Sequence, residues 1–284
     1  MTDLAPLVAT AGPVTLPYRD PGFPDRLLNL HAARPASWHP GLPVLFVHHG
    51  VNRNGRDYRD YWLPHVDPGG LLAIAIEFPQ TSFPDHLWYN FGNLRSAEGS
   101  LNPRPDWTFG IVSRLFAALR DQGITKTLRY GLFGHSAGGQ FVHRMLSFGY
   151  RDRVAVAVGA NAGTYAMPDL SIDWPWGLGG TDLGAEDLAA LLQFPLTIMA
   201  GTEDTKTTGR HFPGGPRSLR QGPTRHARAH SYLRAGGQAA ASLGVELGWR
   251  VIDVPGVGHD GRRMSDAAAP LIAEALKRRA HALD

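Results

Sequence analysis

A serine, an acidic residue and a histidine occur in this chain in an order that suits nucleophilic catalysis. The serine is Ser136, within Gly134-His-Ser-Ala-Gly138, which has the Gly-x-Ser-x-Gly pattern of a nucleophile elbow. A serine hydroxyl reacts well only when a sharp turn exposes it and a base removes its proton, and small flanking residues permit such a turn. We therefore expect Ser136 to be a covalent nucleophile.

The pentapeptide alone is a weak signal, because 34 of the 284 residues are glycine and an ordinary glycine-rich loop could contain it. Its surroundings favour the elbow, since an apolar run precedes it as a strand would and a helical pattern follows it. The first amides and the dipole of that helix would face the oxygen that becomes negative during attack. We expect the amide of Ala137 to be one oxyanion-hole donor.

Two further polar segments follow predicted strands, which is where the active residues of an open α/β sheet collect. One contains Asp204 and the other contains His259. The order Ser136, Asp204, His259 is that of the α/β-hydrolase triad. We expect His259 to accept the serine proton and later return it to the leaving group, while Asp204 orients His259. The adjacent Glu203 is the alternative acid.

A second oxyanion-hole donor is expected where the apolar run 43–48 ends. Gly50 would let the backbone approach the serine, so that the amide of Val51 could pair with that of Ala137. The alternative is that the neighbouring His48 and His49 bind a metal ion. Adjacent strand residues point to opposite faces, so one ion could hardly use both histidines. We expect neither a metal nor a cofactor.

These residues need a scaffold that gathers them at one edge of a sheet. Apolar runs alternate with helical patterns along most of the chain, which predicts an α/β-hydrolase fold with a mostly parallel, doubly wound sheet and helices on both faces. The expected strands are 26–31 (an antiparallel edge strand), 43–48, 71–78, 128–133, 154–158, 194–201 and 249–254.

The length and the 43% hydrophobic content fit one large domain, which we place at residues 13–284. Loop excursions are expected near 79–106, 162–190 and 205–224. Residues 1–12 lack both a basic start and a clean apolar run, so we expect a mobile tail rather than a signal peptide, and a cytoplasmic protein.

Composition excludes several other classes. The chain has no cysteine, which rules out disulfides and a thiol nucleophile. No apolar stretch approaches the length of a membrane span. The net charge of +3 and the pI of about 9.3 could suggest nucleic acid, but the arginines are scattered rather than striped, so we expect none to bind. The expected partner is a small-molecule ester, and the oligomeric state is open.

Aromatic residues in the excursions could line a substrate pocket, because such pockets are mostly apolar. Tyr165, Trp88 and Trp176 are the candidates, and Tyr165 is the strongest because it follows the strand expected beside the elbow. The alternative is that these rings only anchor the long loops.

Four segments resemble the poly(3-hydroxybutyrate) depolymerase-like esterases, a family of α/β-hydrolases that includes feruloyl-esterase-like members. They are Phe46-Val-His-His-Gly-Val-Asn-Arg-Asn-Gly-Arg-Asp-Tyr58, Gly134-His-Ser-Ala-Gly-Gly139, Asn161-Ala-Gly-Thr-Tyr165 and Val254-Pro-Gly-Val-Gly-His-Asp260. The resemblance runs from about residue 26 to 275. It implies a cofactor-free serine esterase in which the acid is an Asp shortly after its strand.

This chain departs from the extracellular polymer depolymerases of that family. It has no cysteine, and we expect neither the secretion signal of those enzymes nor a separate substrate-binding domain. The resemblance therefore implies a soluble short-chain or hydroxyalkanoate-type ester rather than solid polyester. Two alternatives stay open, namely an amide hydrolase or acyltransferase that uses the same triad, and a non-catalytic binding protein built on this fold.

Overall fold

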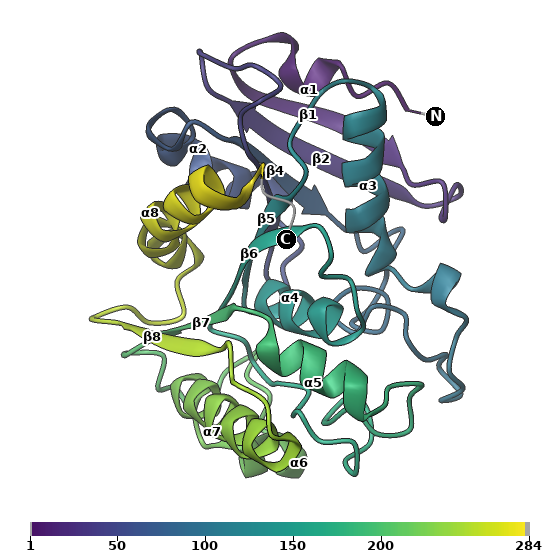
Figure 1. Cartoon of the computed structure of the whole chain (residues 1–284), viewed down its shortest axis with the longest axis vertical. Helices are drawn as coiled ribbons and strands as arrows, with labels where there is room; N and C mark the ends of the chain where they lie inside the picture. Colours follow the sequence, from purple (N-terminus) through teal and green to yellow (C-terminus); the bar gives the residue numbers. More distant parts are fainter. Residues whose placement is uncertain (1, 282–284) are drawn as a thin grey trace.

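Eight strands form one sheet at the centre of the computed structural model, which describes residues 2–281 (Figure 1). The order across the sheet is β1-β2-β4-β3-β5-β6-β7-β8. β1 and β2 pair antiparallel, as do β2 and β4, and every other neighbouring pair is parallel. The predicted α/β-hydrolase fold is confirmed. The strands are β1 (Gly12–Arg19), β2 (Leu27–Arg34), β3 (Val44–His48), β4 (Leu72–Glu77), β5 (Tyr130–His135), β6 (Val154–Ala160), β7 (Leu196–Gly201) and β8 (Arg250–Val254).

Helices cover both faces of this sheet. Helices α2 and α8 pack on one face, and α3, α4, α5 and α7 lie against the other (Figure 1). The helices are α1 (Pro6–Ala9), α2 (Gly55–Gly69), α3 (Gly110–Asp121), α4 (Ala137–Ser147), α5 (Ala185–Gln193), α6 (Pro216–Gln221), α7 (Arg225–Leu243) and α8 (Gly261–Arg279), with a short 3₁₀ turn η1 (Arg104–Asp106). No helix in this described part of the chain is both long and apolar enough to cross a membrane.

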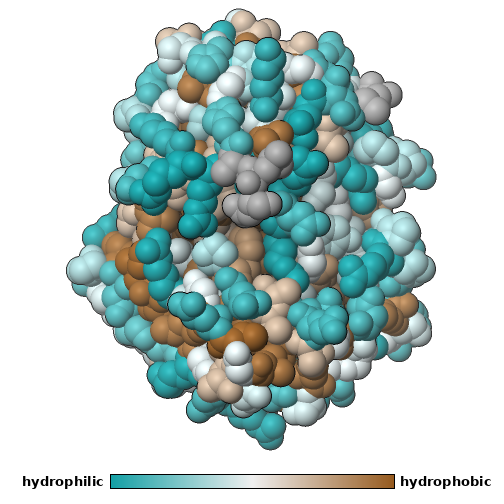
Figure 2. Space-filling model, in the orientation of Figure 1, coloured by the Kyte–Doolittle hydropathy of each residue, from teal (hydrophilic) through white to brown (hydrophobic). Residues whose placement is uncertain are grey.

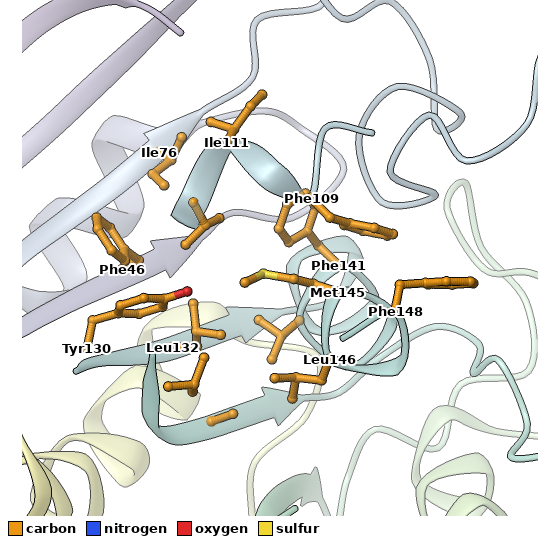
Figure 3. Packing of buried hydrophobic residues seen from close by; sticks show 14 of the residues in the cluster. Phe46, Ile76, Phe109, Ile111, Tyr130, Leu132, Phe141, Met145, Leu146 and Phe148 are labelled. Carbon is orange, nitrogen blue, oxygen red and sulfur yellow. The ribbon is translucent and has the colours of Figure 1, made fainter. Parts of the chain in front are cut away.

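The central strands are apolar throughout because both of their faces are covered. Successive side chains of a strand point to opposite faces, so Phe46 joins the core under α3 and α4 while Leu45 joins the core under α2 and α8. Figure 3 shows Phe46 of β3 beside Tyr130 of β5, with Met145 and Leu146 of α4 in the same cluster. The surface is different in character, and Figure 2 shows hydrophilic residues over most of one face.

The N-terminal segment is part of this packing, so the expected mobile tail is wrong for the described residues. Leu4 and Leu7 are fully buried, and the Leu4 amide donates to Gln122 Oε1 at 2.8 Å. Strand β1, which the sequence reading missed, begins directly afterwards. Pro13 and Pro17 obscured it, but proline is tolerated on an edge strand such as β1.

Three long excursions, which follow β4, β6 and β7, are attached to α4 and α7 by two buried arginines. Arg144 of α4 is completely buried, and its guanidinium donates to the carbonyl of Asn90 and to Thr164 Oγ1. Arg228 of α7 likewise donates to the carbonyls of Gly163 and Pro213. Each buried arginine therefore joins two excursions, which holds these loops in place.

We expect Leu132→Ala to lower the free energy of unfolding by about 2–5 kcal/mol, because it leaves a cavity in the core between β5 and the helices. Leu63→Ala is the matched control, since Leu63 is 38% exposed and its loss should change stability by about 0.5 kcal/mol or less. Urea denaturation of both variants measures the difference. Equal losses would contradict the assignment of Leu132 to the core.

Candidate active site

Ser136 lies at a turn between β5 and α4 that only small residues can form. Its backbone has φ 57° and ψ −116°, a conformation that is strained for a residue with a side chain. A Cβ on Gly134 would lie 2.2 Å from the carbonyl oxygen of Gly138, and a Cβ on Gly138 would lie 2.1 Å from that of His48. The two glycines therefore let β3, β5 and α4 approach one another at the serine.

The three residues expected to form a triad lie within hydrogen-bonding distance. His259 Nε2 is 2.9 Å from Ser136 Oγ, and His259 Nδ1 is 2.7 Å from Asp204 Oδ2. Asp204 is 1% exposed, whereas the rival acid Glu203 points to solvent. The carboxylate that reaches the imidazole is thus the one from Asp204.

The other oxygen of the Asp204 carboxylate faces Arg225. The Arg225 guanidinium lies 3.4 Å from Asp204 Oδ1, and both side chains are buried. The backbone amide of His226 also donates to the main-chain carbonyl of Asp204 at 3.3 Å. The start of α7 therefore holds the acid in place. Sequence reasoning missed Arg225, because Arg225 and Asp204 are 21 residues apart in the chain and no local pattern indicates their contact.

His135, directly before the serine, packs against the ring of His259 with 4.7 Å between the ring centroids. Its Nδ1 shares a hydrogen bond of 2.7 Å with the hydroxyl of Tyr58. Burial lowers the pKa of His135 well below its ordinary value, and the neighbouring His259 and Arg225 act in the same direction. His135 is therefore neutral, so it supports the His259 ring without placing a positive charge beside it.

The segment expected to supply the second oxyanion donor passes directly beside the serine. A Cβ on Gly50 would lie 3.7 Å from Ser136 Cβ. The next residue, Val51, has an exposed side chain, whereas Ala137 is buried at the start of α4. This arrangement allows the backbone amides of Val51 and Ala137 to donate hydrogen bonds to the same substrate oxygen atom.

The two histidines before Gly50 have packing roles. Burial lowers the pKa of His48 and of His49 to about 3, so both are neutral. His48 stacks on Phe141 at 4.2 Å. His49 Nδ1 donates to the carbonyl of Gly50 at 2.8 Å, while its Nε2 accepts from the amide of Phe78 at 3.1 Å. Both ring nitrogens of His49 are thus occupied in shaping the loop beside Ser136.

Asn161 connects the segments that carry the acid and the histidine. Its Oδ1 accepts from the amide of Gly201 at 2.8 Å, and its Nδ2 donates to the carbonyl of Gly258 at 2.9 Å. Asn161 adopts a positive φ of 45°, which asparagine tolerates better than most residues. The sequence reading included Asn161 only within a family-like segment and assigned it no role.

The proposed pocket role of Tyr165 needs correction. Its ring is 1% exposed and is stacked on Tyr232 at 4.4 Å, with His143 on another side at 5.0 Å. It is therefore an interior packing residue that cannot touch a substrate in this conformation. Gln221 donates to the Tyr165 carbonyl and accepts from its amide, which ties α6 to the excursion.

The two tryptophans lie elsewhere at the surface. Trp88 is half-buried, and the guanidinium of Arg26 covers its ring at 3.7 Å. Trp176 lines a pocket of about 420 Å³ together with Met167, Ile172 and Arg220. No triad residue lines this pocket. Trp88 thus contacts Arg26 and Trp176 lines a separate pocket, so no contact of either ring with Ser136 is seen.

A mostly parallel sheet that presents a serine on a strand-to-helix turn defines the α/β-hydrolase class. Among solved structures, the chain is similar to LpqC, a poly(3-hydroxybutyrate) depolymerase from Bordetella parapertussis, at 42% identity and a TM-score of 0.89 over 93% of this chain and 91% of that one. It is also similar to poly(aspartic acid) hydrolase-1 from Sphingomonas sp. KT-1, at 34% identity and a TM-score of 0.89 over 93% of this chain and 99% of that one. The chain belongs to the poly(3-hydroxybutyrate) depolymerase-like esterase family of α/β-hydrolases, and it is a hydrolase.

More distant structures share only the fold. An S-formylglutathione hydrolase from Agrobacterium tumefaciens is 16% identical, with a TM-score of 0.58 over 95% of this chain and 97% of that one. No model of a protein family matches the chain, and no curated protein sequence matches it either.

We expect Asp204→Asn to lower kcat by roughly 10²- to 10⁴-fold, because the amide would no longer hold the imidazole in the correct tautomer. Glu203→Gln is the matched control and should retain most activity, since Glu203 is exposed. Steady-state hydrolysis of a chromogenic ester by both variants provides the test. A greater loss in Glu203→Gln would reassign the acid.

Proposed function

We propose that this hydrolase is a serine esterase that cleaves a carboxylic ester through an acyl-enzyme. In the first half of the reaction, Ser136 Oγ attacks the ester carbonyl carbon while His259 Nε2 accepts its proton. Asp204 stabilises the imidazolium that forms. The amides of Val51 and Ala137 bind the oxygen that becomes negative, where preorganised donors are most effective.

Collapse of the tetrahedral intermediate breaks the bond between the carbonyl carbon and the alcohol oxygen. His259 donates its proton to that oxygen, so the alcohol leaves and the acyl group stays on Ser136. A water molecule then attacks the acyl carbon and gives a proton to His259, which returns it to Ser136 Oγ as the acid departs. The cycle consumes one water and regenerates the enzyme.

The observation that carries this proposal is the continuous hydrogen-bonded series from Ser136 through His259 to Asp204, with separations of 2.9 and 2.7 Å. The strained turn at Ser136 supports it too, because such strain often accompanies a functional site. A non-catalytic binding protein would have little need for all three groups in this geometry.

For the substrate, we propose a short-chain or hydroxyalkanoate-type ester, in keeping with the 42% identical poly(3-hydroxybutyrate) depolymerase. Amide hydrolysis is the second candidate, because the 34% identical relative is named for hydrolysis of poly(aspartic acid). Both reactions share the acyl-enzyme and differ in the leaving group that His259 must protonate.

We expect a fluorophosphonate probe to form one covalent adduct, located by mass spectrometry on the peptide that contains Ser136. Ser136→Ala should abolish labelling and lower kcat by roughly 10³-fold or more while the fold is retained. Circular dichroism checks the fold of the variant. Labelling at another residue, or an active Ser136→Ala variant, would disprove the mechanism.

The bond that is cleaved can be tested with p-nitrophenyl esters of increasing chain length, assayed beside a p-nitroanilide of the best acyl group. We expect kcat/KM to be greatest for short acyl chains and to be far lower for the anilide, because an amine is a poorer leaving group than a phenol. Comparable values for the anilide and the ester would favour the amidase.

A further inference from the structure

Two histidines on α7 converge on one carboxylate of β8. His226 and His230 are separated by four residues, so they lie on the same face of the helix one turn apart. The Nε2 atoms of both rings lie 2.9 Å from Asp253 Oδ1. None of these residues takes part in the proposed reaction.

The donor set and its geometry suit a transition-metal ion. Imidazole nitrogen and carboxylate oxygen are common ligands of Zn²⁺, and two histidines spaced i, i+4 on a helix are a recurrent pair in zinc sites. The three ligand atoms of this group lie within 4.8 Å of one another. Neighbouring ligand atoms around a tetrahedral zinc are roughly 3.3 Å apart, so small side-chain rotations would complete the arrangement.

An ion could reach these three side chains from solvent. All three side chains are partly exposed, and Asp253 lies on β8 at the edge of the sheet. Among residues 2–281, this is the one group of three histidine, cysteine or acidic side chains that converges in this way.

We propose that His226 Nε2, His230 Nε2 and the Asp253 carboxylate form a binding site for a divalent transition-metal ion such as Zn²⁺. Water completes the coordination sphere on the exposed side. The ion replaces the shared hydrogen bonds, because each neutral imidazole presents the Nε2 lone pair when its proton resides on Nδ1.

The position of the site indicates a bracing role. The His226 amide donates to the Asp204 carbonyl, and the strand that contains Asp253 leads directly into the loop that carries His259. A bound ion would therefore join the start of α7 to the end of β8, which are the segments that hold the acid and the histidine of the triad.

Zinc binding can be measured by isothermal titration calorimetry on protein first stripped with a chelator. We expect one equivalent to bind tightly, and we expect His230→Gln and Asp253→Asn each to weaken binding by roughly tenfold or more. His65→Gln is the matched control, since His65 makes a similar surface contact with Asp266 at 2.7 Å but has no second imidazole there. It should leave the affinity unchanged.

Thermal unfolding and diffraction provide independent readouts. Zinc should raise the melting temperature of the wild-type protein by several degrees and that of His226→Gln/His230→Gln by little, because only binding to the folded state stabilises it. Crystals soaked in zinc should show an anomalous peak between the three side chains. Wild-type protein that binds no zinc in several-fold excess, or His230→Gln and Asp253→Asn that bind it as tightly as wild type, would overturn the proposal.

Discussion

The close approach of three backbone segments at Gly134, Gly138 and the end of β3 is the constraint on which the rest of the site depends. A single Cβ at either glycine would collide with a neighbouring carbonyl oxygen. Because no side chain separates them, the start of α4 lies against the loop that follows β3, and Ser136 is held between the two. The strained backbone of Ser136 is maintained by this packing, since the surroundings must over-determine a conformation that is unfavourable in isolation.

The histidine and the acid reach that point by a different kind of interaction. They lie on loops after the last two strands, and loops are positioned by hydrogen bonds more than by apolar burial. Asn161 joins the two loops, and Arg225 holds the carboxylate of Asp204 from the side opposite His259. These buried side chains make hydrogen bonds to specific partners, which makes the arrangement both rigid and sensitive to substitution.

The same principle organises the long excursions around the site. Arg144 and Arg228 are buried, and burial lowers the pKa of Arg144 to about 9 and that of Arg228 to about 10. Both guanidinium groups donate to loop carbonyls, and that of Arg144 also donates to the side chains of Thr164 and Gln140. The excursions bury apolar side chains of their own, such as Phe83 and Tyr165, and the two guanidinium groups attach these loops further to α4 and α7, which pack on the sheet.

The sequence by itself determined the α/β sheet, the turn at Ser136 and the chain order of the three triad candidates, because apolar runs, glycine spacing and turn residues act locally. Only the tertiary structure shows that the Asp204 carboxylate reaches His259 while the adjacent Glu203 is exposed, because two adjacent residues differ in which one faces the interior. It also showed that Leu4 and Leu7 are buried and that the ring of Tyr165 faces Tyr232 rather than a pocket. Some contacts join residues far apart in the chain, such as Arg225 with Asp204, or Asp253 with His226 and His230. No local sequence pattern specifies such pairs, because they form only when the helices pack on the sheet.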